Sequence, residues 1–278
     1  MKQRTITAIF FVAIMLAGVF GHLYSFLLLF GLITVVSAWE LMSLLFGPEA
    51  DHLLLRKVTG SALAALFYGI FSYSTLNRMQ TGVGLPAMDP MLVITCLALP
   101  FLVLLGLELV LASRQPFPSI GNYLLAVVYV ALPFALLVSL ATDGGQYMPL
   151  RVLGLMLLNW SNDTMAYLIG SQIGKRPFFS RISPKKTWEG TLGGIVGVFV
   201  VSWLLSMIIP DFSRSEWLAL GAVAAVMGTA GDLVESMLKR SVHIKDSGNI
   251  MPGHGGFLDR FDSLIYFLPF AWVVIRLF

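Results

Sequence analysis

Charged residues are scarce in this chain. Asp, Glu, Lys and Arg make up 12% of its 278 residues, whereas soluble domains carry about 25%. Hydrophobic residues make up 57%, and apolar runs of about 20 residues, each long enough to cross a bilayer, recur along the whole length. The composition excludes a soluble globular protein and indicates an all-α, polytopic membrane protein.

Cysteine is nearly absent as well. The single cysteine, Cys96, lies in an apolar run, which excludes an intrachain disulfide and a cysteine-ligated metal site. The spacing of His243 and His254 fits no usual zinc motif. We therefore expect a hydrogen-bonding role for His254, which stands in a glycine-rich stretch. The chain also shows no internal repeat, so an inverted-repeat transporter has no support.

Continuous hydrophobicity predicts nine transmembrane helices. The first is expected to be retained, because no small-residue cleavage site follows its basic start and apolar run. The nine predicted spans are roughly Thr5–Phe20, Leu23–Phe46, Val58–Ser74, Met91–Leu111, Ile120–Leu140, Arg151–Ile169, Thr191–Ile209, Glu216–Lys239 and Phe257–Phe278.

The placement of basic residues predicts a cytosolic N-terminus in the cell (inner or plasma) membrane. This orientation leaves only Arg78, Arg151, Arg214 and Arg276, of the 18 Lys and Arg residues, on the far side. Two long polar segments then face the cytosol: the basic segment, residues 170–190, and the glycine-rich segment, residues 240–256. We expect residues 1–140 to form an N-terminal part with helices 1–5, and residues 141–278 a catalytic part with helices 6–9.

Carboxylates within the predicted spans are the main candidates for function. Asp232 and Glu235 are three residues apart, hence on one helical face, and Asp232 lies about 10 Å deep at 1.5 Å per residue. A carboxylate at that depth costs about 2.5–3.5 kcal/mol on insertion scales. The alternative for Glu235 is an i,i+4 pair with Lys239. The more distant Glu40 and Glu108 can reach the membrane interface instead.

A second acidic pair, Asp259 and Asp262, begins the last span. The alternative role for Asp262 is capping of that helix. Both acidic pairs border the glycine-rich segment, where Gly255 and Gly256 let the backbone approach a ligand closely. Because Mg²⁺ prefers a few carboxylates together with substrate phosphates, the candidate metal ligands are Asp232, Glu235, Asp259 and Asp262.

Two further motifs carry polar groups. The basic segment contains the string Ser183-Pro-Lys-Lys-Thr-Trp-Glu-Gly190, whose hydroxyls and paired cations are typical of phosphate binding; contact with anionic lipid headgroups is the alternative. In the sixth span, Asn159, Asp163 and Tyr167 follow at i, i+4 and i+8. We expect this stripe to face inward, with Asp163 buried near the cytosolic side.

The C-terminal half resembles the phosphatidate cytidylyltransferases (CDP-diacylglycerol synthases). The motifs that carry the resemblance are Ser236-x-x-Lys239-Arg240, Lys245-Asp246-x-Gly248 and Pro252-Gly-His-Gly-Gly-x-x-Asp259-Arg260-x-Asp262, together with the string in the basic segment and Asn162-Asp163 with Ala166-Tyr167. The N-terminal half matches only in hydrophobicity and in Trp39-Glu40.

The resemblance implies that CTP and phosphatidate react to give CDP-diacylglycerol and pyrophosphate. It also implies metal ligation by Asp232 and Asp259, with Mg²⁺ and K⁺ as candidate ions, and a homodimer; we expect no nucleic-acid partner. The candidate catalytic residues are Asp163, Asp232, Lys239 and Asp259. The candidate substrate-binding residues are Ser183, Lys185, Lys186, Thr187, Glu189, Ser236, Arg240, Lys245, Asp246, His254, Gly255, Gly256 and Arg260.

Other functions stay open at this point. A CTP-dependent lipid or isoprenoid-alcohol kinase would show related carboxylate and lysine patterns, but it would transfer the γ-phosphate. A transporter would explain polar intramembrane residues, although not the lysine-rich and glycine-rich strings. The motif of CDP-alcohol phosphotransferases is not found in the sequence.

Overall fold

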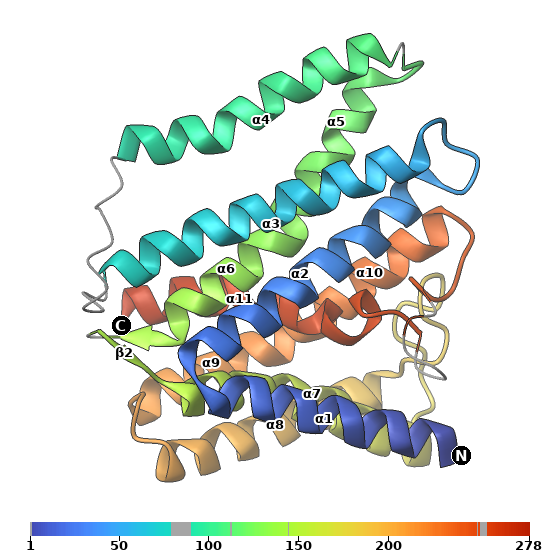
Figure 1. The fold of residues 1–278 in the computed structure, drawn as a ribbon. Helices are drawn as coiled ribbons and strands as arrows, with labels where there is room; N and C mark the ends of the chain where they lie inside the picture. The colour runs from blue at the N-terminus through green and yellow to red at the C-terminus, as the bar shows by residue number, and fades with distance from the viewer. Residues whose placement is uncertain (1, 79–89, 112, 144, 249, 251–254) are drawn as a thin grey trace. The chain divides into compact units, whose positions relative to one another are not determined.

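The computed structural model describes residues 2–78, 90–111, 113–143, 145–248, 250 and 255–278, and most of them are helical (Figure 1). The elements in chain order are α1 (Lys2–Gly21), α2 (Leu23–Phe46), α3 (Leu53–Arg78), α4 (Pro90–Val110), α5 (Pro116–Leu125), the π-helical turn η1 (Ala126–Ala131), α6 (Leu132–Leu140), β1 (Thr142–Asp143), β2 (Gln146–Tyr147), α7 (Pro149–Ile173), α8 (Trp188–Ile208), α9 (Arg214–Val223), the π-helical turn η2 (Ala224–Gly228), α10 (Thr229–Ser241) and α11 (Leu258–Leu277). The two strands pair antiparallel.

The predicted spans coincide with helices to within a few residues. Two of these helices contain a π-helical turn and run continuously over Pro116–Leu140 and Arg214–Ser241. Within the described residues, five helices are long and apolar enough to cross a membrane: Leu23–Phe46, Leu53–Asn77, Pro116–Leu140, Trp188–Ile208 and Arg214–Ser241. The prediction of an all-α membrane protein is confirmed, while the number of spans and their orientation stay predictions.

The chain divides into two compact units. The first unit comprises residues 1–147 and 247–258, and the second comprises residues 148–246 and 259–278. In the first unit, α2 and α3 lie side by side, and Phe30 packs between Phe26 and Phe134 in the core (Figure 1). The predicted functional division at residue 140 is a separate matter and stays a prediction.

The first unit contains a buried ion pair that sequence reasoning missed. Arg56 donates to Glu108 Oε1 at 2.9 Å and to Ser119 Oγ at 2.9 Å, and its guanidinium lies over the ring of Phe46. Arg56 is 5% exposed and Glu108 1% exposed. The expectation that Glu108 reaches the interface was therefore wrong: its charge is neutralised by an arginine on a neighbouring helix.

In the second unit, α7 and α8 pack closely along a row of glycines (Figure 1). A Cβ at Gly190 would lie 2.7 Å from the carbonyl oxygen of Ala166, and a Cβ at Gly194 would lie 2.8 Å from Asn162 Oδ1. Small residues allow such close approach of helices where the lipid supplies no hydrophobic driving force. This packing fixes α7 beside the start of α8, where the basic segment ends.

Candidate active site

A cavity of about 450 Å³, with several charged and hydroxyl side chains in its lining, lies in the second unit. Its walls come from α7, the basic segment, the first turn of α8 and the start of α10. The side chains that bring charge or hydroxyl groups to it are those of Asp163, Tyr167, Ser171, Lys185, Lys186, Thr187, Thr191, Thr229 and Asp232. The sequence singled out all of these residues except Ser171, Thr191 and Thr229, and the structure brings them together in one place.

The basic segment is folded so that its lysines reach the cavity. Its two ends pair: Phe178 N donates to Lys186 O at 2.7 Å and Trp188 N donates to Arg176 O at 2.9 Å. A tight turn closes between them, in which Lys186 N donates to Ser183 O at 3.1 Å. The backbone of the segment is thus fixed locally, and Lys185 and Lys186 are held at the cavity wall.

Two residues of the string at positions 183–190 hold the backbone of the basic segment. Glu189, in the first turn of α8, accepts hydrogen bonds from Lys175 N at 3.0 Å and Arg176 N at 3.2 Å. Thr187 Oγ1 caps α8 by accepting from Gly190 N at 3.2 Å. Both residues were predicted to bind substrate. The structure gives Glu189 a role in holding the segment; direct contact of Glu189 or Ser183 with a substrate stays a prediction.

Asp232 is the carboxylate of α10 that faces this cavity. Its Oδ2 forms an ion pair with Lys186 Nζ, and its Oδ1 accepts from Ser236 Oγ at 3.3 Å. The side chain is 31% exposed, so it is open to a ligand in the cavity. This contact joins the basic segment to α10, two parts of the chain that the sequence treated as separate motifs.

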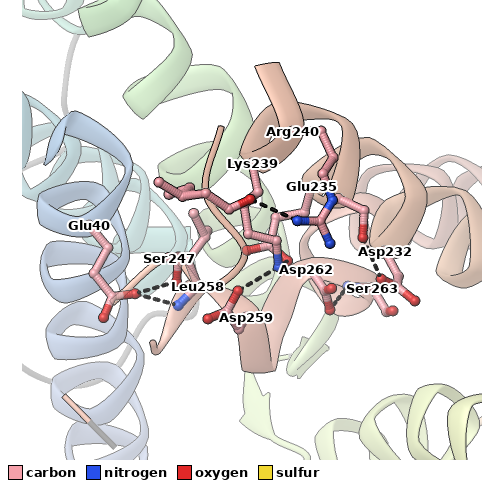
Figure 2. A network of polar contacts seen from close by, with 12 residues as sticks. Glu40, Asp232, Glu235, Lys239, Arg240, Ser247, Leu258, Asp259, Asp262 and Ser263 are labelled. Carbon is pink, nitrogen blue, oxygen red and sulfur yellow. Dashed lines mark hydrogen bonds and ion pairs between the residues drawn. The ribbon is translucent and has the colours of Figure 1, made fainter. Parts of the chain in front are cut away.

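A second charge cluster joins α10 to α11. Lys239 Nζ lies 3.1 Å from Glu235 Oε2 and 2.6 Å from Asp259 Oδ1 (Figure 2). Glu235 is completely buried. The i,i+4 pair that the sequence offered as the alternative for Glu235 is present, but the sequence did not reveal that the same ammonium group also binds Asp259.

The remaining acidic candidates differ in position from what was expected. Asp262 does not cap α11: it stands in the second turn, where its Oδ1 accepts from Ser263 N at 2.6 Å. Of the predicted inward stripe on α7, only Asn159 is buried, at 3% exposure. Asp163, predicted to be buried, is exposed and lines the cavity together with Tyr167, because the inward side of α7 borders this open cavity.

The other signature residues lie around the glycine-rich segment. Arg240 Nη1 donates to Ile244 O at 3.0 Å, which holds the turn after α10. Gly255 has φ of 82°, a conformation that favours glycine, and Gly256 is buried. Lys245, Asp246 and Arg260 are exposed on the molecule. His254 lies outside the described residues.

The donor groups at the cavity fit a hard cation. Within the described part of the chain, no group of three or more His, Cys, Asp or Glu side chains is placed to hold a metal ion. Mg²⁺ needs only one or two carboxylates when substrate phosphates complete its shell, and Asp232 offers such an oxygen to the cavity. Asp259 is bound by Lys239, so it would ligate a cation only by exchanging that partner.

Sequence reasoning gave too little weight to Glu40. Glu40, expected to reach the interface, is only 3% exposed and accepts hydrogen bonds from the backbone N–H groups of Phe257 and Leu258. The only signal in the sequence is a carboxylate within an apolar span, directly after Trp39.

Comparison with known proteins shows to which family the chain belongs. The model of the cytidylyltransferase family matches residues 2–278. A Bacillus subtilis (strain 168) protein named phosphatidate cytidylyltransferase is 31% identical over 284 residues, which cover 100% of this chain and 98% of that protein. Proteins of the same name from Staphylococcus saprophyticus and Staphylococcus aureus (strain COL) are 38% and 37% identical over 175 and 181 residues, covering 62% and 64% of this chain and 65% and 67% of theirs. Since the family model matches almost the whole length, the chain belongs to the cytidylyltransferase family.

Proposed function

We propose that this protein is a phosphatidate cytidylyltransferase, a nucleotidyltransferase of phospholipid biosynthesis that converts CTP and phosphatidate to CDP-diacylglycerol and pyrophosphate. Family membership and the names of relatives that match over most of the chain support this assignment. The structural observation that carries it is the cavity in which Lys185, Lys186 and Asp232 converge.

The reaction needs positioning and charge neutralisation more than covalent chemistry. An oxygen of the phosphatidate phosphate attacks the α-phosphorus of CTP, a new P–O bond forms, and the bond from the α-phosphorus to the bridging oxygen breaks. Pyrophosphate leaves with that electron pair. Both reactants are anionic, so cationic groups must offset their repulsion and the charge that develops on the leaving group. Lys185 and Lys186 are placed at the cavity wall for this task.

The proposed site also includes a divalent cation. Mg²⁺, when bound, would neutralise phosphate charge and orient the triphosphate. We propose Asp232 as its main protein ligand, with Asp259 as the second carboxylate and K⁺ as an additional ion. The open, cavity-facing carboxylate of Asp232 supports the first assignment. Lys239 then has two roles: it compensates the charge of Glu235, and it releases Asp259 when a cation replaces it.

The proposal also covers the number of transmembrane spans, their orientation and the oligomeric state. We propose nine transmembrane spans and a cytosolic N-terminus, because basic residues gather in the segments that this orientation places inside. The protein would then reside in the cell membrane, with its cavity facing the cytosol where CTP is available. A homodimer is proposed on the resemblance alone.

A labelling experiment separates this function from its rivals. The purified full-length protein would be incubated with phosphatidate, Mg²⁺ and CTP carrying label either in the cytidine or at the γ-phosphate. Lipid that carries cytidine supports the cytidylyltransferase. Lipid that carries only the γ-phosphate indicates a CTP-dependent kinase, and absence of both labels from lipid, with an active positive-control enzyme in the same assay, favours the transporter.

A further inference from the structure

Glu40 is a buried carboxylate in the first unit with an unusual set of partners. Its Oε2 accepts from Leu258 N at 2.9 Å and from Ser247 Oγ at 3.1 Å, and its Oε1 accepts from Phe257 N at 3.1 Å. Figure 2 shows the side chain reaching from α2 to Ser247 and Leu258. A buried carboxylate is costly unless it is hydrogen-bonded, and these donors provide that compensation.

Two of these donors are backbone N–H groups at the start of α11. The first N–H groups of a helix have no partner within the helix, and a negative charge there also interacts favourably with the helix dipole. Such groups are usually capped by a residue just before the helix. At the start of α11 the cap is instead Glu40, which precedes Leu258 by 218 residues in the sequence. The start of α11 is therefore fixed by a side chain of α2.

Two glycines show how closely the chain wraps around this carboxylate. A Cβ on Gly248 would lie 2.5 Å from Glu40 Oε1, and a Cβ on Gly256 would lie 2.5 Å from Glu40 Oε2. Any larger residue at either position would have to displace the carboxylate. Glu40 thus lies against described residues from two parts of the chain, Ser247 and Gly248 on one side and Gly256 to Leu258 on the other.

We infer that Glu40 is a positioning residue for catalysis, acting through the backbone of Phe257 and Leu258 at the start of α11. The residue that follows Leu258 is Asp259, whose carboxylate lies 2.6 Å from Lys239 Nζ. A change in where α11 begins would move Asp259 without changing the chemistry of any group in the site. The inference rests on the proposed function, since it concerns the rate of cytidylyl transfer.

The first test compares Glu40→Gln with Glu108→Gln in the purified full-length protein. Both replace a buried glutamate of the first unit by its amide, but Glu108 forms an ion pair with Arg56, whereas Glu40 caps the start of α11. Because small displacements of catalytic groups can cost about 100-fold in rate, Glu40→Gln should lower kcat by that order. Glu108→Gln should lower the melting temperature with kcat nearly unchanged. Similar kcat for Glu40→Gln and the wild type would overturn the inference, as would a loss of kcat in Glu108→Gln as large as that in Glu40→Gln.

A double-substitution cycle adds a readout that general destabilisation would not produce. Gly248→Ala should impair the enzyme in the wild-type background, because the new Cβ meets Glu40. In a Glu40→Ala background the three atoms nearest to the new Cβ are absent, so the same change should add little further loss. Equal, additive effects in both backgrounds would contradict the proposed contact. Ser247→Ala removes one donor only and should give a smaller loss of kcat; it serves as the test if the Glu40 variants do not fold.

Proteolysis separates this inference from the proposed function. Lys245 is exposed and lies two residues before Ser247, which Glu40 binds, so trypsin should cut after it faster in Glu40→Gln than in Glu108→Gln or the wild type. If the wild-type protein lacked cytidylyl transfer, the proposed function would fail, yet the cleavage rates would still decide whether Glu40 holds this part of the chain. Unchanged cleavage in Glu40→Gln would refute this role of Glu40.

Discussion

Lys239 Nζ lies 2.6 Å from Asp259 Oδ1, a contact that joins α10 to α11. The same nitrogen lies 3.1 Å from Oε2 of the buried Glu235. Lys186 and Asp232 form a comparable pair at the cavity. Without substrate, the acidic and basic groups of the site therefore neutralise one another. Under the proposed function, binding of a nucleotide with its cation would require these pairs to exchange partners, lysine toward phosphate and carboxylate toward the cation.

The shared role of Lys239 predicts separate effects on stability and activity. Lys239→Gln leaves the buried Glu235 without its cation, and breaking a buried pair in this way costs about 3–5 kcal/mol. The double variant Glu235→Gln/Lys239→Gln removes both charges and should recover much of the stability without recovering cytidylyl transfer. Melting in detergent and turnover would be measured in parallel. Lys245→Gln, at an exposed position, is the control for stability. A double variant as unstable as Lys239→Gln would contradict the pairing.

The basic segment predicts a contrast between two lysines. Lys186 lines the cavity and pairs with Asp232, whereas Lys175 is exposed and contributes only its backbone N–H to Glu189. Lys186→Ala should lower kcat/KM for CTP by about 100-fold, the usual order for loss of one group that stabilises developing charge. Lys175→Ala should leave it nearly unchanged. Small and equal effects would assign the whole segment to contact with lipid headgroups.

The hydrogen bonds of Glu189 predict that its substitution changes KM for CTP more than kcat. Glu189→Gln weakens the hydrogen bonds that hold Lys175 N and Arg176 N, so the segment carrying Lys185 and Lys186 should loosen. We expect KM for CTP to rise several-fold with a smaller change in kcat. Glu216→Gln is a matched control, because Glu216 also accepts a backbone N–H at the start of a helix, from Ser213. An equal rise in KM for both variants would show a nonspecific effect.

The sequence predicted the helices better than the contacts between them. Long apolar runs determine where helices form in a membrane, and the charged motifs were placed on the helices that carry them. The partners of Glu40, Glu108 and Glu189 could not be predicted, because they depend on how each helix is rotated about its axis. A pair such as Glu40 and Leu258, 218 residues apart, leaves no periodic signal in the sequence. Because the rotation of α7 could not be predicted either, Asp163 was expected to be buried, whereas it faces a cavity.

The proposed orientation predicts which residues an impermeant thiol reagent reaches in intact cells. Replacement of Cys96, the single native cysteine, gives a background for single cysteines at Ser180, Ser241 and Ser215, which are all exposed. Ser215→Cys should react from outside, whereas Ser180→Cys and Ser241→Cys should react only after permeabilisation. Reaction of either of the latter two in intact cells would refute the cytosolic placement of the basic and glycine-rich segments.

The metal assignment gives the sharpest prediction for the site. Asp232→Asn and Asp259→Asn keep the shape of each side chain but remove the charge that would hold Mg²⁺, so each should abolish cytidylyl transfer while the protein still inserts and folds. The double variant should be no worse than either single one, because residues that act as one unit have non-additive effects. Asp262→Asn should reduce turnover less, since the carboxylate of Asp262 accepts from its neighbour Ser263 N.

Magnesium titration distinguishes ligation from a role in charge balance alone. If Asp232 is a ligand, a residual activity in Asp232→Asn should require a higher Mg²⁺ concentration than in the wild type. The variant also leaves Lys186 without its carboxylate partner, so Lys186→Gln, which breaks the same pair from the other side, is the matched control. That control should lose activity with an unchanged Mg²⁺ requirement, because Asp232 keeps its charge. Near-normal turnover of Asp232→Asn at low Mg²⁺ would exclude this carboxylate as a ligand and leave the cation to be held by other residues.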